Sequence, residues 1–258
     1  MKSLTSALRV LSTFADKSGS LSAAEIADAL GLGRSHASKI LNDLREAGFI
    51  DQDPKTRMFA VAARSFALGS QYLANSALAR VATGPMRRVA DQTGQTTTLC
   101  TLHGLDVLHL AAIEGRHFLD VGWRVGTWVP FHATAVGKVL FAFAPRSLFE
   151  QAVAERGLPR LTSKTICEAD ALDRQFEKVR RTGFSETSEE TMAGLAAQAV
   201  PVFGPDQEVL GSLGLIYPVH TVESGGRRNL ADELHGAARE ISGRMGAQLY
   251  PFGTVHPR

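Results

Sequence analysis

Apolar residues near the start of the chain recur every three or four positions, the spacing that one face of an amphipathic helix requires. This spacing predicts a first helix over residues 3–16. A second helix is predicted over residues 23–30, because Ser22 and Glu25 have the spacing of a capping box, in which each side chain accepts a hydrogen bond from a free backbone amide. The glycine-containing stretch 31–33 is expected to end this second helix.

A third helix with two different faces is predicted from residue 34 to about residue 45. Ala37, Ile40, Leu41 and Leu44 stand at positions i, i+3, i+4 and i+7 and form one apolar stripe. The opposite face is polar and carries Arg34, Ser35, His36, Ser38, Lys39 and Asn42. Two short helices joined by a glycine turn are typical of a helix-turn-helix motif.

A hairpin and a linking helix are predicted next. Residues 49–52 and 58–61 form two short strands around the turn 53–56, in which Pro54 presets a turn dihedral. This hairpin has the place of a wing beside the helix-turn-helix. The segment 65–82 predicts a linking helix with more apolar surface than one domain needs, and we expect it to contribute to dimerisation.

From Pro85 onward the pattern becomes a mixture of strands and helices. Strand-like runs occur at 96–102, 107–113, 118–123, 199–203 and 209–216, and helical stretches at 134–143, 148–156, 168–182 and 229–249. This order predicts an antiparallel sheet covered by helices. The expected fold class is therefore α+β, with a winged helix-turn-helix over 1–64, a linking helix over 65–82 and a larger α/β domain over 83–251.

Composition limits the class of protein further. The chain has 258 residues, of which 44% are hydrophobic and 21% charged, as expected of a globular protein with two domains. No stretch approaches the roughly 20 apolar residues of a membrane span, and no signal peptide is evident, so we expect a cytoplasmic protein without membrane contact. Cys100 and Cys167 have neither metal-site spacing nor a disulfide framework, so no metal or other cofactor is expected.

Net charge adds a weak indication of a nucleic-acid partner. The whole chain carries a formal charge of +2, whereas residues 1–80 hold ten Lys and Arg against seven Asp and Glu. The positive excess therefore lies in the part that contains the predicted helix-turn-helix.

Five segments, taken together and in order, resemble the IclR family of bacterial regulators, and the resemblance covers nearly the whole chain. They are 6–11 (SALRVL), 26–32 (IADALGL), 44–50 (LREAGFI), 131–140 (FHATAVGKVL), and the stretch from 183–184 (GF) through 199–203 (AVPVF). The resemblance implies a winged helix-turn-helix joined by a linker helix to a GAF-like effector-binding domain. It also implies double-stranded operator DNA as a partner, bound by homodimers that often pair into tetramers.

The third helix is the expected reader of DNA, because an α-helix fits the major groove, where each base pair presents a distinct pattern of donors and acceptors. Base-edge contacts are expected from Arg34, Ser35, His36 and Lys39, on the same face as Ser38 and Asn42. Contacts to phosphate are expected from Arg45, Lys55 and Arg57. The alternative from the pattern alone is the solvated face of an ordinary helix pair.

The resemblance also implies an effector cavity between the sheet and the loop that leads into the helix at 134–143. Its expected lining is His132, Thr134, Ala135, Val136, the segment Thr187, Ser188 and Glu189, and Ala197, Gly214 and Ile216. Free amides at the start of that helix favour an anion such as a carboxylate. Members of the family that bind small oxo-acids carry hydroxyl side chains where Gly214 and Ile216 stand here. We therefore expect a roomier, more apolar cavity and, as effector, an organic carboxylate of a catabolic pathway, with a larger, aromatic one favoured. His132 has an alternative role as a hydrogen-bonding group within its loop.

Two other classes of protein remain as alternatives. An enzyme finds little support, because residues 211–214 are not a nucleophile elbow and residues 137–138 lack the rest of a phosphate loop. Cys100, His103 and His109 lack a fourth metal ligand, and we expect no enzymatic activity. The other alternative is a DNA-binding structural protein whose larger domain only oligomerises. The sequence names neither the effector, the operator nor the sign of regulation, and it leaves dimer and tetramer open.

Overall fold

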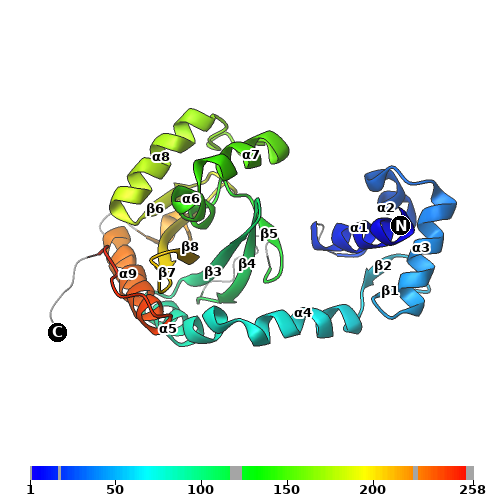
Figure 1. The fold of residues 1–258 in the computed structure, drawn as a ribbon, viewed down its shortest axis with the longest axis horizontal. Helices are drawn as coiled ribbons and strands as arrows, with labels where there is room; N and C mark the ends of the chain where they lie inside the picture. Colours follow the sequence, from blue (N-terminus) through cyan, green and yellow to red (C-terminus); the bar gives the residue numbers. More distant parts are fainter. Residues whose placement is uncertain (1, 17–18, 117–123, 223–225, 254–258) are drawn as a thin grey trace. The chain divides into compact units, whose positions relative to one another are not determined.

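The computed structural model describes residues 2–16, 19–116, 124–222 and 226–253 (Figure 1). The chain divides into two units, Met1–Asn75 and Ser76–Arg258, and each is described by itself. The first unit contains α1 (Lys2–Asp16), α2 (Ala23–Leu30), α3 (Arg34–Glu46), β1 (Ile50–Gln52), β2 (Phe59–Val61) and α4 (Ala63–Asn75). The predicted helix-turn-helix and hairpin are therefore present.

The capping box predicted at the start of α2 is confirmed. The Ser22 hydroxyl accepts a hydrogen bond from the backbone N–H of Glu25 at 3.2 Å, and the Glu25 carboxylate accepts one from the backbone N–H of Ser22 at 2.8 Å. The helix ends at Gly31, whose φ of 64° lies in the left-handed region that glycine adopts without strain. These local interactions fix both ends of α2.

A small core holds the three helices and the hairpin together. The stripe of α3 formed by Ile40, Leu41 and Leu44 is buried in it together with Val10, Phe14, Leu21, Ile26, Ile50 and Phe59. The backbones of Leu21 and Phe59 also exchange two hydrogen bonds of 2.8 Å, which add a third segment to the hairpin. The hairpin is thereby fixed to the segment that precedes α2.

The linking region differs from the single helix expected over 65–82. It contains α4 and a separate helix α5 (Ala77–Thr93), with an interruption at Ser76. Ser76 has extended backbone angles, and its hydroxyl accepts a hydrogen bond from the backbone N–H of Ala79 at 3.2 Å, so it acts as the N-cap of a new helix. Helix α5 continues past Pro85, where the mixed pattern was expected to begin, because its buried face packs on the sheet.

The second unit is a six-stranded antiparallel sheet with helices on both faces (Figure 1). The strand order is β5-β4-β3-β8-β7-β6. The strands are β3 (Thr96–His103), β4 (Asp106–Ile113), β5 (Trp128–Val129), β6 (Ser185–Ser188), β7 (Leu195–Phe203) and β8 (Val209–Pro218). The further helices are α6 (Ala135–Phe143), α7 (Arg146–Arg156), α8 (Ala169–Thr182), α9 (Gly226–Arg244) and the short 3-10 helix Val219–Thr221.

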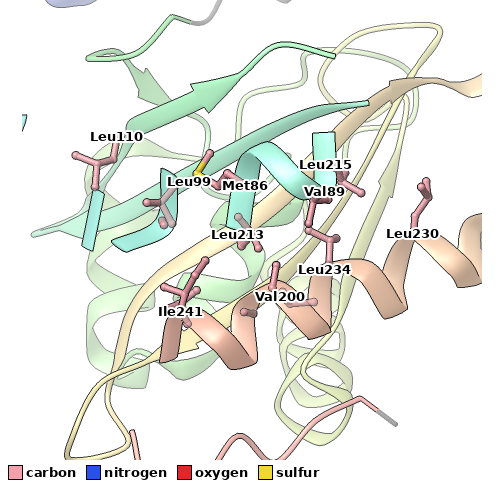
Figure 2. Close-up of a cluster of buried hydrophobic side chains, with 14 of the residues drawn as sticks. Met86, Val89, Leu99, Leu110, Val200, Leu213, Leu215, Leu230, Leu234 and Ile241 are labelled. Atoms are coloured by element: carbon pink, nitrogen blue, oxygen red, sulfur yellow. The ribbon is translucent and has the colours of Figure 1, made fainter. Parts of the chain in front are cut away.

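Each face of this sheet has its own core. Helices α5 and α9 cover one face, where Met86 and Val89 meet Leu213 and Leu234 (Figure 2). Helices α6, α7 and α8 cover the other face, with a core centred on Phe141, Phe149 and Phe176. The alternation of side chains along each strand decides which core a strand residue enters.

The predicted antiparallel sheet is confirmed, and four of the five predicted strands correspond to β3, β4, β7 and β8. The predicted strand at 118–123 lies outside the described residues. The sequence analysis missed β5 and β6. The polar sequence Ser-Glu-Thr-Ser of β6 shows no apolar alternation, and this segment becomes a strand because it pairs with β7.

Candidate DNA-reading helix and ligand cavity

The two faces of α3 are separated as the sequence predicts. Ala37, Ile40, Leu41 and Leu44 are buried. The side chains of the polar face and the neighbouring arginine are all exposed: Arg34, Ser35, His36, Ser38, Lys39, Asn42 and Arg45. This part of α3 therefore offers a row of donors and acceptors to an external partner.

The hairpin places two further cations at its tip. Lys55 and Arg57 are both exposed. The tip is shaped by Asp53, whose carboxylate accepts hydrogen bonds from the backbone N–H groups of Lys55 at 2.7 Å and Thr56 at 2.9 Å. The same bonds hold the pKa of the Asp53 carboxyl below its usual value. Within the described part of the chain no acidic side chain forms a salt bridge with either cation.

A cavity lies between the sheet and the start of α6. Its volume is about 40 Å³, which is room for about three water molecules. Residues from all six strands, from α6 and its N-cap, and from the segment before β7 line it: Thr98, Cys100, His109, Val129, Thr134, Ala135, Val136, Thr187, Thr191, Leu195, Ala196, Ala197, Gln198, Gly214, Leu215 and Ile216. The lining is mixed, with threonine hydroxyls and one imidazole among apolar groups.

Most of the residues expected around an effector lie on this cavity. They are Thr134, Ala135, Val136, Thr187, Ala197, Gly214 and Ile216. Thr134 caps α6, because its hydroxyl accepts from the backbone N–H of Gly137 at 3.1 Å and donates to the carbonyl of Pro130 at 2.7 Å. The cap fixes the direction in which the first turn of α6 points.

The structure places three of the expected residues away from the cavity. The ring of His132 is hydrogen-bonded to the carbonyl of Pro159 at 2.9 Å and borders a different, open hollow on the surface. Glu189 pairs with Lys164 and accepts a hydrogen bond from the backbone N–H of Gly194 at 2.9 Å, which turns its carboxylate outward. Ser188 does not border the cavity either. His132 therefore forms a structural hydrogen bond, as in its alternative role, but to the loop that follows α7 and not within its own loop.

The extra room expected at Gly214 is absent. A Cβ atom at this position would lie 2.8 Å from Cγ1 of Val136 and 3.0 Å from Oγ1 of Thr98. Helix α6 packs so closely on the sheet that its Val136 side chain takes the space that a side chain on β8 would need. Gly214 thus permits close packing and does not widen the cavity.

Two residues that the sequence analysis considered only as metal ligands also line the cavity. Cys100 on β3 and His109 on β4 are directly opposite each other in the sheet, so both side chains point to the α6 face. Burial raises the pKa of the Cys100 thiol and lowers the pKa of His109, so both groups are held neutral. The described residues contain no group of three potential metal ligands.

A buried ion pair lies next to the cavity wall. The ammonium group of Lys138 on α6 is 2.7 Å from both carboxylate oxygens of Glu190, and its side chain is fully buried. Glu190 precedes Thr191, which lines the cavity. The pair therefore joins α6 to the segment that leads from the end of β6 along the cavity.

The first unit has the architecture of a winged helix-turn-helix. The second is an α/β domain with a cavity between its sheet and the start of α6. The family model described as "IclR helix-turn-helix domain" matches residues 3–54, and that described as "Bacterial transcriptional regulator IclR C-terminal" matches residues 70–243. The chain belongs to the IclR family of DNA-binding transcriptional regulators, whose C-terminal domain binds effectors.

Curated relatives agree with this assignment over most of their length. The chain is 31% identical over 253 residues to the glycerol operon regulatory protein of Streptomyces griseus, covering 96% of both chains. It is 29% identical over 228 residues to the HTH-type transcriptional regulator KdgR of Escherichia coli, covering 88% of this chain and 87% of KdgR.

Solved structures share the fold. A structure of an IclR transcriptional regulator from Silicibacter sp. TM1040 superposes with a TM-score of 0.82 at 25% identity, covering 98% of this chain and 100% of that one. An IclR homologue from Microbacterium hydrocarbonoxydans, solved in complex with 4-hydroxybenzoate, has a TM-score of 0.78 at 24% identity, covering 94% and 98%. No helix in the described part of this chain is long and apolar enough to cross a membrane.

Proposed function

We propose that this regulator reads its operator with the outward face of α3 in the major groove. The observation that carries the proposal is the division of α3 into a buried stripe and an exposed polar face with two cations, Arg34 and Lys39. Ser35, His36, Ser38 and Asn42 lie on the same helix and add neutral hydrogen-bonding groups. Arginine and lysine at this face match the acceptors that guanine presents in the major groove.

Arg45 at the end of α3 and the hairpin cations Lys55 and Arg57 are proposed to contact phosphate. Such contacts give affinity and register without reading sequence. They also make affinity depend on salt, because each neutralised phosphate releases condensed counterions.

Fluorescence anisotropy on a labelled duplex from the DNA that flanks this gene tests the proposal. We expect Arg34→Ala and Lys39→Ala each to lower affinity about 5- to 150-fold, the effect of losing 1–3 kcal/mol of base contact. Arg181→Ala, an exposed arginine at the end of α8, is the matched control and should bind like the wild type. Equal binding by all four proteins, or binding indifferent to DNA sequence, would show that α3 is not the reader.

We propose that the cavity under α6 receives an organic carboxylate of a catabolic pathway as effector. The first-turn amides of α6 that Thr134 does not cap belong to Ala135 and Val136, two residues that line the cavity, and a helix N-terminus favours an anion. The volume of about 40 Å³ has room for about three waters and suits a small carboxylate. The complex of the Microbacterium homologue with 4-hydroxybenzoate shows that one protein of this fold accepts an aromatic acid.

A thermal-shift screen of aliphatic and aromatic carboxylates tests this part. A ligand that binds only the folded state stabilises it by RT ln(1 + [L]/Kd), about 2.7 kcal/mol at a hundredfold excess over Kd. An effector among the compounds that raise the melting temperature should also change operator affinity. It must bind the DNA-binding and the non-binding conformation of the regulator with different affinities, because a ligand that binds both equally does not shift the equilibrium between them. The absence of any shift would favour the alternative in which the larger domain only oligomerises.

We further propose that the protein is not an enzyme. Cys100 and His109 are the neighbouring pair that comes closest to a nucleophile and its base, and burial raises the pKa of that thiol, whereas a nucleophilic cysteine needs a lowered pKa. The curated relatives named above are regulators.

Helix α4 is the proposed site of dimerisation. None of its side chains is buried within the chain, and Phe66 and Leu73 are 76% and 37% exposed. They are seven residues apart and therefore share one face of the helix. Burial of such side chains against a second copy is favourable because it removes apolar surface from water. Exposed apolar patches of this kind often mark interaction sites. Pairing of such dimers into tetramers would use a further surface.

A further inference from the structure

His109 is a buried polar residue on the wall of the cavity. It lies on β4 directly opposite Cys100 of β3, and the residue is only 4% exposed. Its backbone is hydrogen-bonded to the turn that leads into β5, with His109 N–H donating to Thr127 at 2.9 Å and Gly126 N–H donating to the His109 carbonyl at 2.8 Å. The strand and this turn hold the residue in place at the cavity.

Neither ring nitrogen of His109 makes a well-formed hydrogen bond with a described residue, and the one group that interacts with the ring is the backbone of Ala111, two residues further along β4. Burying such a group without a partner destabilises the folded protein, so most buried polar groups in proteins are paired. The other two histidines that are buried among the described residues of this unit have partners: His132 is bonded to the Pro159 carbonyl, and His235 to the Tyr250 hydroxyl at 3.0 Å. His109 is therefore the histidine of the three that needs a group from within the cavity.

We propose that His109 selects the effector by hydrogen-bonding to a hydroxyl group that the effector carries in addition to its carboxylate. The inference rests on the proposed function, because it assumes that the cavity binds an organic acid. It narrows the effector class to hydroxycarboxylic acids, whose carboxylate lies at the amides of Ala135 and Val136.

The chemistry of the ring favours a hydroxyl over a second carboxylate. Burial lowers the pKa of His109, an effect that the backbone of Ala111 opposes in part, so the ring is neutral near pH 7. A neutral imidazole offers one donor and one acceptor, and a hydroxyl group also has both. A carboxylate would use only the donor, and the acceptor nitrogen would stay unpaired. The other titratable group on the cavity wall, the Cys100 thiol, is likewise neutral.

The experiment compares ligands that differ by one hydroxyl group. Isothermal titration and thermal shift are measured with lactate against propionate and with 4-hydroxybenzoate against benzoate. One pair is aliphatic and fits the small cavity, and the other is aromatic. In the wild type we expect the hydroxylated member of at least one pair to bind about 3- to 10-fold more tightly, the effect of one net hydrogen bond.

Two substitutions remove the ring nitrogens in different ways. His109→Leu replaces the ring, and His109→Phe keeps an aromatic ring without nitrogen. In both variants we expect the preference for the hydroxylated acid to disappear, with the affinity for the deoxy acid unchanged within about twofold. Without ligand, both should melt at or above the wild-type temperature, because they remove an unpaired polar group. His235→Gln, which keeps a hydrogen-bonding group opposite Tyr250, is the matched control and should keep the preference.

The outcomes separate this inference from the proposed function. A wild-type preference that survives both His109 substitutions would overturn the role of His109 and leave the effector site standing. If the His109 variants lose affinity for both the hydroxylated and the deoxy acid of a pair, His109 contacts the carboxylate, and this also overturns the inference. Variants that melt well below the wild type would make His109 a structural residue. If none of the four acids binds the wild type, both the inference and the carboxylate proposal fail, while operator binding by the same samples still reports on α3.

Discussion

Lys138 and Glu190, which are 52 positions apart in the sequence, form a buried ion pair. Both carboxylate oxygens accept a hydrogen bond of 2.7 Å from the same ammonium group, and the two side chains are 0% and 8% exposed. The backbone carbonyl of Glu190 also accepts a hydrogen bond of 2.6 Å from the hydroxyl of Thr165. The segment that borders the cavity is thus attached to α6 on one side and to the loop before α8 on the other.

Removing one partner of this pair should be costly. Lys138→Met or Glu190→Leu leaves the other charge, or its neutralised form, without its partner in the interior, and we expect a loss of about 3–5 kcal/mol in the free energy of unfolding. The double variant Lys138→Met/Glu190→Leu should lose less than the sum of the two single variants, because no buried charge is left. Urea unfolding of the four proteins measures this coupling, and additive losses would contradict it.

Filling the space at Gly214 should destabilise the fold. Gly214→Ala places a methyl group against Val136 and Thr98 on a closely packed surface, for which we expect a cost of about 1–3 kcal/mol. Val136→Ala removes the nearest atom, so Gly214→Ala in that background should cost clearly less. The midpoint of urea unfolding measures both effects. An equal cost in both backgrounds would mean that the contact with Val136 is not the cause.

The stability of the protein should fall in mild acid. Burial is the main reason why the pKa of His235 falls from 6.5 to about 4, so between these values the unfolded state binds a proton that the folded state does not. Stability therefore is lost as pH falls through this window, on the order of 2–3 kcal/mol from this residue. His109 and His132 act in the same direction, because their pKa values are lowered as well.

Unfolding at pH 7 and pH 4.5 tests the share of His235. In His235→Gln the difference in the free energy of unfolding between the two pH values should shrink by about 2–3 kcal/mol. The part of the difference that comes from other groups should remain. An unchanged difference would show that His235 is protonated in the folded protein in the same range as in the unfolded chain.

The proposed dimer should depend on the apolar face of α4. Phe66→Ser/Leu73→Ser removes two exposed apolar side chains that contribute to no core within the chain, so the isolated subunit should keep its stability. Sedimentation velocity across a range of concentrations should show a dimer that dissociates at least tenfold more readily. Gln71→Ser, also exposed on α4, is the control for the helix itself. An unchanged association would place the interface elsewhere.

The local pattern of the sequence determined the helix-turn-helix unit of the protein. The stripe Ala37, Ile40, Leu41 and Leu44, and the capping pair Ser22 and Glu25, act between residues three or four positions apart. Contacts of this range need no knowledge of the rest of the chain, so the bounds of α2 and α3 follow from the sequence. The exposed cations of α3 follow as well, since the buried stripe fixes which face remains outside.

The tertiary structure decided the cavity. The position of His109 beside Cys100 depends on strand register, the space at Gly214 depends on how closely α6 packs, and strand β6 exists through its pairing with β7. These contacts join residues far apart in the sequence, so their outcome depends on the packing of the whole sheet. Sequence periodicity assigned faces within each element, whereas the packing of α6 on the sheet determined which of those faces enclose a cavity and how large it is.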